Sequence, residues 1–281
     1  MKLTRRHFFG MTAAALPGVA YTRVLEPGWL ERCDVDVGIA GGKLKGEIRV
    51  LHLSDFHASP CVSPKLIDGA ITMGLEARPD IAVLTGDFIT DRLRDEETFG
   101  KSLEKLSAQV PTFACMGNHD GGAWAFARGS YKAAGPVVDF LKGRSITVLV
   151  NESRLLYVRG NVIQLIGLAD LWSGDFATPE PFYPAPNGFS GARIVLAHNP
   201  DSKDRIEAYP WDLMLSGHTH GGQITLPFLG AIFAPVQDFR FIKGLHAWSG
   251  RQLHITKGIG NLHGIRFNCR PEVSVLNLKP I

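Results

Sequence analysis

The sequence predicts an α/β fold in which two β-sheets pack face to face within one domain, with helices outside. In the first half, short apolar runs alternate with segments of helical spacing, which favours parallel strands joined by helices. In the second half, β-rich runs follow one another closely and favour a meander. The chain has 281 residues, 45% of them hydrophobic and 20% charged, which suits one large domain. No apolar stretch reaches the about 18 residues of a membrane-spanning helix.

The expected elements of the first half follow from apolar runs and their boundaries. Residues 21–47 are expected to form an extended entry with one short strand or hairpin. Ser63 is expected to cap the first helix, with Pro64 at its first helical position. Asp91 is interpreted as a cap for the next helix. The expected strands lie at 48–54, 80–85 and 112–117, and the expected helices at 63–77, 94–108 and 130–141.

In the second half, three β-rich runs separated by short turns predict a meander, and a long loop rich in Pro, Gly and Phe follows at 169–191. The meander runs are 146–150, 155–158 and 162–168, and further strands are expected at 194–197, 212–216, 253–257 and 273–278.

Residues 1–20 are expected to be an export signal. A twin arginine is followed by two phenylalanines and a weakly apolar run, which resembles a twin-arginine signal, with small residues at its end for cleavage (Arg5, Arg6, Phe8, Phe9). The alternative is a basic, frayed terminus of a cytosolic protein. We expect export by the twin-arginine machinery to the periplasm, the cell wall or the outer face of the inner membrane. The expected domains are the signal (1–20), an N-terminal extension (21–47) and the main domain (48–281).

The charge distribution argues against a nucleic-acid partner. The formal net charge is +3, and Lys2, Arg5 and Arg6 lie within the first 20 residues, which hold no acid. In the rest of the chain 27 basic residues balance 27 acidic ones. Because nucleic-acid binding usually needs a clustered cationic face, no nucleic acid is expected.

Polar side chains follow five of the expected strands. Alone, an Asp-x-His or Gly-Asp sequence usually reflects turn chemistry. In open α/β sheets, however, ligands bind outside the carboxyl ends of the strands, so these side chains are expected to converge on one site. They are Asp55 and His57, then Asp87, then Asn118, His119 and Asp120, then His198, and finally His218 and His220.

These residues offer oxygen and nitrogen donors without a thiolate, which suits Mn²⁺, Fe or Zn²⁺. Asp87 stands alone on its loop and is the natural bridge between two ions. Two ions about 3.5–4 Å apart clamp the attacking and leaving oxygens of a displacement at phosphorus, and a bound water becomes the nucleophile. Glycines at 86, 117 and 217 are expected to let a phosphate approach closely.

The motifs resemble those of the calcineurin-like metallophosphoesterase superfamily and occur in the family order over nearly the whole chain after the signal. They are Asp55-x-His57, Gly86-Asp87, Gly117-Asn118-His119-Asp120, His198 and Gly217-His218-x-His220. The extended sequence Gly-His-Thr-His-Gly-Gly-Gln and the pair Arg266-Phe267 before Pro271-Glu272 are similar to the bacterial YkuE/YaeI-type phosphoesterase group. The resemblance implies a four-layer αββα sandwich of two mixed sheets and a metal-dependent phosphohydrolase.

The resemblance also implies roles. Two divalent metal ions would share Asp87, the first held by Asp55, His57 and His220 and the second by Asn118, His198 and His218. His119 would contact the phosphate with Asn118 and protonate the leaving oxygen, and Asp120 would orient His119 by accepting from its ring N–H. His263, on a glycine-rich segment, is a further candidate for substrate contact.

Several other residues carry weaker signals. His52, inside a strand, is interpreted as a core histidine or as one that supports a metal ligand without binding the metal, whereas His246 and His254 lie outside the motifs. Cys115 is expected to be a core thiol, and a Cys33–Cys61 or Cys61–Cys269 disulfide stays open. Residues 227–241 form either a hairpin packed on the body or an apolar lip that admits a lipid tail or touches a membrane. Trp172, Phe176 and Phe182 are candidates for the same wall.

The leading function is hydrolysis of a phosphodiester or pyrophosphate bond in an envelope or lipid-linked substrate. The resemblance also suggests a UDP-2,3-diacylglucosamine pyrophosphatase of lipid A biosynthesis, although that reaction faces the cytoplasm and conflicts with an export signal. A non-catalytic metal-binding scaffold is an alternative of a different class, which the presence of His119 and of every ligand disfavours. A nuclease is disfavoured by the balanced charge.

Overall fold

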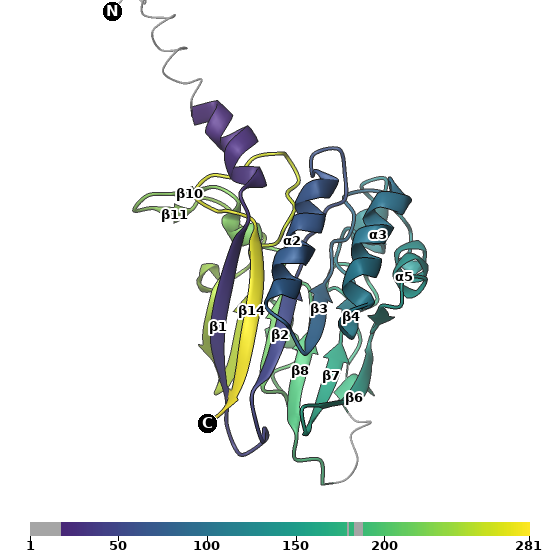
Figure 1. Cartoon of the computed structure of the whole chain (residues 1–281), viewed down its shortest axis with the longest axis vertical. Coiled ribbons are helices and arrows are strands. Elements are labelled where there is room, and N and C mark those ends of the chain that lie inside the picture. Colours follow the sequence, from purple (N-terminus) through teal and green to yellow (C-terminus); the bar gives the residue numbers. More distant parts are fainter. Residues whose placement is uncertain (1–17, 179, 183–187) are drawn as a thin grey trace, which may run out of the picture.

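Two six-stranded sheets pack face to face in the computed structural model, which describes residues 18–178, 180–182 and 188–281 (Figure 1). In spatial order the first sheet comprises β1 (Glu31–Ile39), β14 (Glu272–Pro280), β2 (Ile48–Leu53), β3 (Ile81–Thr85), β4 (Thr112–Cys115) and β5 (Thr147–Val148). The second comprises β12 (Gly244–Trp248), β13 (Arg251–Ile255), β9 (Leu213–Ser216), β8 (Ala192–Leu196), β7 (Asn161–Gly167) and β6 (Glu152–Val158). A small hairpin joins β10 (Thr225–Leu226) to β11 (Gly230–Ala231).

Helices cover the outer face of the first sheet (Figure 1). They are α2 (Pro64–Glu76), α3 (Glu96–Ser107) and α5 (Gly135–Lys142). Their apolar faces, with Ile71, Phe99 and Phe140, pack in one buried cluster with Leu51 and Leu53 of β2. Removal of these side chains from water stabilises this layer.

The second sheet carries a thinner outer layer. Val195 of β8 and Met214 of β9 are buried with Ile206, which follows the short helix α6 (Ser202–Arg205), and with Phe241 from a loop. A further short helix, α4 (Ala123–Phe126), lies in the loop after β4. Helix, sheet, sheet and a last layer of short helix and loops form the expected four-layer αββα sandwich of two mixed sheets, which confirms the predicted fold class.

Parallel pairing brings the functional loops to one edge. β2, β3 and β4 run parallel in the first sheet, and β7, β8, β9 and β13 run parallel in the second. The facing sides of the two sheets share a buried core that includes Val50, Val83, Ile194 and Leu215. The loops after β2, β3, β4, β8 and β9 therefore all leave the sandwich at the carboxyl ends of parallel strands.

Two expectations about helix starts need correction. Ser63 occupies the cap position of α2, and Pro64 follows it, but the Ser63 side chain makes no capping hydrogen bond. The cap of α3 is Asp95, whose carboxylate accepts from the Thr98 amide at 3.3 Å, and not Asp91. Asp91 does not cap the helix, because α3 begins at Glu96, two residues later than the apolar spacing indicated. Its carboxylate instead forms an ion pair of 2.6 Å with Arg94.

The predicted three-run meander is wrong at its first run. β5 pairs in parallel with β4 in the first sheet, and β6 and β7 alone form an antiparallel pair in the second. Local β propensity favours a strand without determining the sheet that it joins.

The N-terminal residues are not simply extended. Tyr21–Leu25 form a turn of π-helix and Glu26–Gly28 a 3₁₀ turn, and β1 then pairs in parallel with β14. The twin-arginine motif lies outside the described residues. In the described chain no helix is long and apolar enough to cross a bilayer. All four cysteines are free, and Cys115 is buried as expected.

Candidate metal centre

The predicted site residues leave their strands through strained turns. Asp55, His57, Asp87, His218 and His220 all have positive φ, between 45° and 70°. Non-glycine residues rarely adopt this conformation, and each such residue costs on the order of 1–3 kcal/mol. Such strain persists where the surrounding structure fixes the backbone, so these five turns mark a functional site.

Glycines allow these turns to press against one another. A Cβ atom on Gly117 would lie 2.2 Å from Oδ1 of Asp87, and one on Gly217 would lie 2.2 Å from Oδ2 of Asp55. The atoms that occupy the space beside them belong to neighbouring loops, so the glycines let these turns lie close together and set the separation of the carboxylates. The close approach of a phosphate beside them stays a prediction.

One group of candidate ligands comprises Asp55, His57 and His220. Nε2 of His57 lies 3.1 Å from Nε2 of His220, which lies 3.5 Å from Oδ1 of Asp55. The Asp55 carboxylate also accepts from the His218 amide at 3.1 Å. These three side chains are buried and present their donor atoms to one point.

A second group comprises Asp87, His198 and His218. Nδ1 of His218 lies 3.2 Å from Nε2 of His198. Oδ2 of Asp87 lies 3.2 Å from Nε2 of His198 and 3.5 Å from Nε2 of His57, so a single carboxylate oxygen faces both groups. This placement is the one expected of a bridging ligand.

The protonation states suit cation binding. Burial lowers the pKa of His57 and of His218 well below the ordinary value and lowers the pKa of His220 to about 4, so these rings are neutral near pH 7. Burial opposes ionisation of Asp87, but the surrounding imidazoles, His198 first among them, together outweigh it and hold the pKa of Asp87 well below its usual range. Burial likewise opposes protonation of His198, but the surrounding carboxylates, Asp87 first among them, outweigh it and hold the pKa of His198 well above its ordinary value. Because metals bind neutral imidazoles and ionised carboxylates, a cation bound here would take the place of the proton on His198.

The residues present fit two divalent ions. Among the described residues none donates to the buried Oδ1 of Asn118, and two pairs of imidazole nitrogens face one another at 3.1 and 3.2 Å. Nδ1 of His198 lies 2.6 Å from the Thr85 carbonyl and donates to it, which fixes the ring with Nε2 toward Asp87. Cations between these donors would satisfy both observations.

His119 lies beside both groups. Its Nδ1 donates to the Thr90 carbonyl at 2.6 Å, which leaves Nε2 as the nitrogen available for proton transfer. Its amide donates to Oδ1 of Asp87 at 2.9 Å, and its ring packs edge-on against Trp124 with centroids 4.7 Å apart. The backbone and the aromatic contact therefore fix the ring.

The expectation that Asp120 accepts from the His119 ring is wrong. The Asp120 carboxylate accepts from the amides of Asp87 at 2.9 Å, Phe88 at 2.8 Å and Gly117 at 2.8 Å. Its oxygens are occupied by two backbone turns, and the His119 ring donates elsewhere. Asp120 thus fixes the Asp87 turn against the Gly117 turn and positions the centre indirectly.

The C-terminal motif, the pair Arg266-Phe267 before Pro271-Glu272, supports the backbone that holds the first ligand group. Arg266 is fully buried and donates to the carbonyls of Lys257 at 2.9 Å, Gly258 at 3.0 Å and Cys269 at 3.0 Å, and also to that of Gly260. The Gly260 amide in turn donates to the Asp55 carbonyl at 2.6 Å. Arg266 therefore fixes the segment that holds Asp55.

The centre opens into a cavity of about 850 Å³ with largely apolar walls. Trp124 packs on His119, and Trp172 packs on His218 with ring centroids 4.6 Å apart. Arg128 stacks on Trp124 at 3.9 Å. Sequence reasoning placed Trp124 only in a small loop and gave Arg128 no role, because no motif marks either residue. The opposite wall comprises Ile224, Ile232, Phe233, Pro235 and Leu262.

Of the other residues that the sequence singled out, one lines this cavity and the rest lie elsewhere. His263 lines it, as expected, but Phe182 is buried against Tyr209 below the second sheet with Phe176 nearby, so these two phenylalanines do not belong to the wall. His52 is a buried core residue, 3.1 Å from His254 and 2.9 Å from Thr85 Oγ1.

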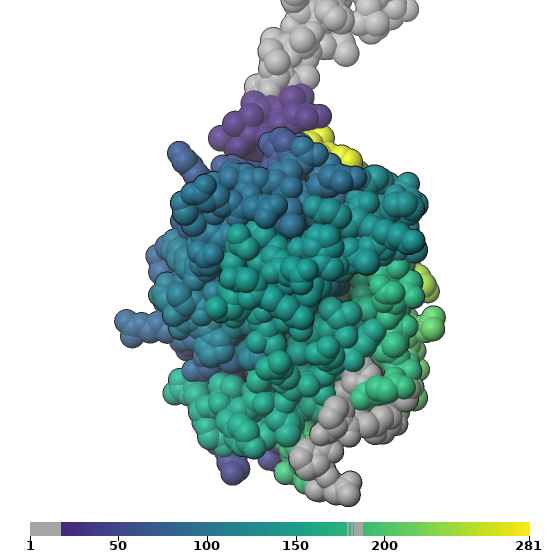
Figure 2. Space-filling model, turned by 90° about the vertical axis from the view of Figure 1, so that its right-hand side faces the viewer, coloured from purple at the N-terminus to yellow at the C-terminus, as the bar shows by residue number. Residues whose placement is uncertain are grey.

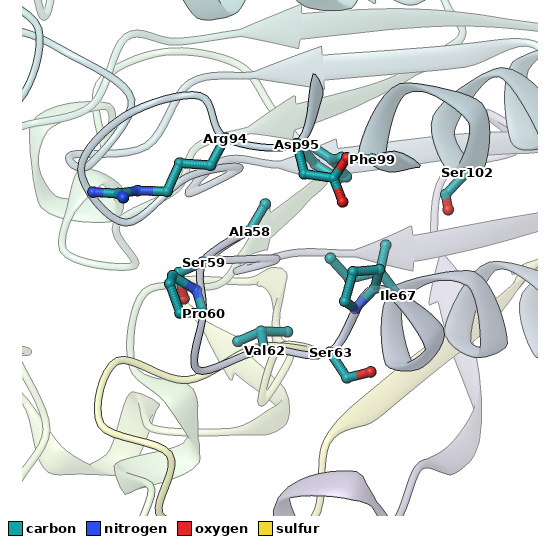
Figure 3. Close-up of a pocket in the computed structure, with 11 residues that line it drawn as sticks. Ala58, Ser59, Pro60, Val62, Ser63, Ile67, Arg94, Asp95, Phe99 and Ser102 are labelled. Carbon is teal, nitrogen blue, oxygen red and sulfur yellow. The ribbon is translucent and has the colours of Figure 1, made fainter. Parts of the chain in front are cut away.

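A smaller cavity of about 260 Å³ lies near the starts of α2 and α3 (Figure 3). Its lining includes the apolar residues Val62, Ile67 and Phe99 and the charged residues Arg94 and Asp95. None of the predicted ligands is among its lining residues, so the larger cavity serves the centre.

Comparison with known proteins agrees with this geometry. Residues 48–222 match the family model of the calcineurin-like phosphoesterases. The chain is 39% identical to phosphodiesterase YaeI of Escherichia coli over 98% of this chain and 99% of that protein. It is 30% identical to the metallophosphoesterase YkuE of Bacillus subtilis over 99% and 98%. It is 25% identical to the UDP-2,3-diacylglucosamine pyrophosphatase LpxG of Chlamydia trachomatis over 82% and 83%. The chain belongs to the calcineurin-like phosphoesterase family and is a hydrolase with a dinuclear divalent metal centre.

Proposed function

We propose that the chain hydrolyses a phosphodiester or pyrophosphate bond in a substrate that carries an apolar, lipid-like portion. The observation that carries this proposal is the cavity of about 850 Å³, in which polar donors converge at one end and apolar side chains form the walls. Such a cavity favours a ligand with a charged head and an apolar body. A small phosphate ester would leave most of these walls without contact.

The roles of the residues follow from their positions. Asp55, His57 and His220 would hold one ion and Asn118, His198 and His218 the other, with Asp87 between them. Bound divalent ions supply Lewis-acid polarisation of the phosphoryl group and activation of water. The Nε2 of His119 would donate a proton to the leaving oxygen, because Nδ1 is held by the Thr90 carbonyl.

We further propose that the substrate belongs to the cell envelope and that the protein meets it after twin-arginine export. The twin arginine within residues 1–17 supports this location, although it lies outside the described structure. UDP-2,3-diacylglucosamine is the second candidate substrate. It combines a pyrophosphate with two acyl chains, and the relative LpxG is named a UDP-2,3-diacylglucosamine pyrophosphatase. Its hydrolysis in lipid A biosynthesis faces the cytoplasm, which conflicts with export, so it ranks second.

The test compares three substrate classes with the Mn²⁺-loaded protein. These are bis-p-nitrophenyl phosphate, a lipid-linked pyrophosphate and UDP-2,3-diacylglucosamine, with p-nitrophenyl phosphate as the monoester control. We expect the highest kcat/KM with one of the two substrates that carry apolar chains, and no turnover by Asp87→Asn. Turnover of the soluble esters alone would contradict the apolar substrate, and bound metal without turnover of any ester would favour the scaffold.

A further inference from the structure

Exposed large apolar side chains of the described chain concentrate in two segments. One is residues 19–29, and the other is the β10–β11 hairpin with the residues that follow it. They are Val19, Val24, Leu25 and Trp29 in the first, and Phe228, Leu229, Ile232, Phe233 and Phe239 in the second. We call these nine residues the apolar end. Both segments lie at the same end of the molecule, beyond the carboxyl ends of β2 and β3 (Figure 1).

Contacts through the C-terminal motif join the two segments. The Thr22 carbonyl accepts from the Arg266 amide at 2.9 Å, and Tyr21 packs edge-on against Phe267 with centroids 6.4 Å apart. The Phe267 carbonyl accepts in turn from the Thr225 amide of β10 at 2.9 Å. Figure 2 shows the purple N-terminal segment beside a yellow part of the C-terminal region. The apolar end is therefore one continuous structural unit.

Neither packing nor backbone conformation within the hairpin favours an aromatic residue at its tip. Phe228 lies in the loop between Leu226 and Gly230, which pair across the hairpin. Its φ is 67° and its side chain is fully exposed. Glycine or asparagine normally occupies a left-handed position in such a loop, and a bulky residue there is an outlier. Both the backbone strain and the exposure disfavour phenylalanine unless an apolar partner contacts it.

The hairpin connects this surface to the metal centre. Ile232 and Phe233 are more than half exposed, at 61% and 71%, and they also line the large cavity. Phe228 and Leu229 do not belong to the lining residues. An apolar path thus runs from the hairpin tip along the hairpin into the cavity.

We propose that the apolar end docks on the surface of a lipid bilayer, so that a substrate tail passes from the bilayer into the cavity along the hairpin. Protruding apolar side chains flanked by cationic residues are typical of membrane-interface binding. Arg23 lies between the apolar residues of the first segment, whose acid, Glu26, is buried. The Arg270 guanidinium stacks on Trp29 at 4.2 Å and also pairs with Glu31 at 3.6 Å, so Arg23 is the cation that this end presents to a headgroup.

The bilayer is a better occupant than a second copy of the chain because of this charge. Two copies of the apolar end would bring like charges together, whereas anionic headgroups complement them. The delivery of substrate rests on the proposed function, but the docking itself does not.

The experiment measures co-sedimentation of the full-length protein with vesicles of phosphatidylethanolamine and phosphatidylglycerol, and with phosphatidylcholine vesicles. The test variant is Phe228→Asn with Leu229→Ser, because asparagine accepts the left-handed backbone. The matched control is Tyr157→Ser, which removes an equally exposed aromatic from β6, away from the apolar end. We expect the parent to bind the anionic vesicles more tightly. The tip variant should bind at least about 100-fold more weakly, as expected for loss of two inserted apolar side chains.

The outcomes separate the two proposals. Unchanged hydrolysis of bis-p-nitrophenyl phosphate by the tip variant, with the weaker vesicle binding, supports docking. Equal binding by the parent and the tip variant would overturn it, as would a parent dimer that the tip variant dissociates in analytical ultracentrifugation. Loss of vesicle binding in the tip variant, in a protein that turns over no apolar substrate, would leave docking standing and overturn the proposed function.

Discussion

The metal-centre loops and the cavity walls are held in different ways. The loops are buried, strained and fixed by backbone hydrogen bonds, as when Asp120 binds three amides of neighbouring turns. The walls include exposed side chains such as Trp172, Ile232 and Phe233, of which Trp172 also packs on His218 and Trp124. This difference indicates that reaction chemistry depends on the loops, whereas the choice of substrate depends on side chains that change with little effect on the fold.

The largest effect is expected at the shared carboxylate. Asp87→Asn keeps the size of the side chain and removes the charge that faces both ligand groups. Mn²⁺-dependent hydrolysis of bis-p-nitrophenyl phosphate should fall to the background rate, and metal content measured by mass spectrometry should fall below two ions per chain. Full metal content with full activity would show that Asp87 does not bridge.

A smaller effect is expected at His119. His119→Ala should lower kcat by about 100-fold or more for an alkyl diester, which needs a proton on its leaving oxygen. The loss should be smaller for bis-p-nitrophenyl phosphate, because p-nitrophenolate leaves without protonation. Metal content should stay unchanged. Equal losses for both substrates would indicate that His119 does not protonate the leaving group.

Arg266 tests whether the support behind Asp55 affects metal binding. Lysine cannot reproduce the planar fork that reaches four carbonyls, so Arg266→Lys should weaken Mn²⁺ binding about tenfold, as outer-shell changes do. Titration followed by electron paramagnetic resonance measures this affinity. Arg270→Lys, at a more exposed arginine of the same segment, is the control. Identical affinities in the parent and both variants would contradict a positioning role.

A further effect, on the fold and not on the reaction, concerns stability and pH. Burial lowers the pKa of His254 to about 4, whereas the unfolded chain takes up this proton near pH 6.5. The folded state therefore binds fewer protons, and the free energy of unfolding falls as the pH falls from about 6.5 to 4, by roughly 3 kcal/mol for this group.

Urea unfolding at pH 7 and pH 5 measures that slope. His254→Asn should be less stable than the parent at pH 7, and the difference should narrow at pH 5. The exposed His263→Asn is the control and should follow the parent. A difference that stays constant with pH would exclude His254 as a source of acid lability.

Sequence alone predicted that these side chains converge, because parallel strands bring their carboxyl ends to one edge, and the structure places them in neighbouring groups. Asp55, Asp87 and His198 are far apart in the chain, yet each follows a short apolar run that forms a strand. The packing of these strands then brings the three residues together. The partner of Asp120 was not predictable, because adjacency to His119 in sequence does not show which of several nearby donors a carboxylate meets.

The cavity walls were harder to predict. Trp124 belongs to no motif. Whether Trp172 or Phe182 lines the cavity depends on how the long loop that carries both residues folds back on the second sheet. The start of α3 was misplaced because Asp95 caps it from a left-handed conformation that spacing does not reveal. Side chains that depend on loop paths leave little periodic signal.

The most direct test of this division compares kcat/KM for a diester with acyl chains and for bis-p-nitrophenyl phosphate in the parent and in the double variant Ile232→Ser with Phe233→Ser. These two residues line the cavity and are not among the candidate metal ligands. We predict that the kcat/KM of the double variant for the acyl-chain diester falls by about tenfold or more. Its kcat/KM for bis-p-nitrophenyl phosphate should equal that of the parent. Equal losses on both substrates would contradict the separation of chemistry from substrate choice.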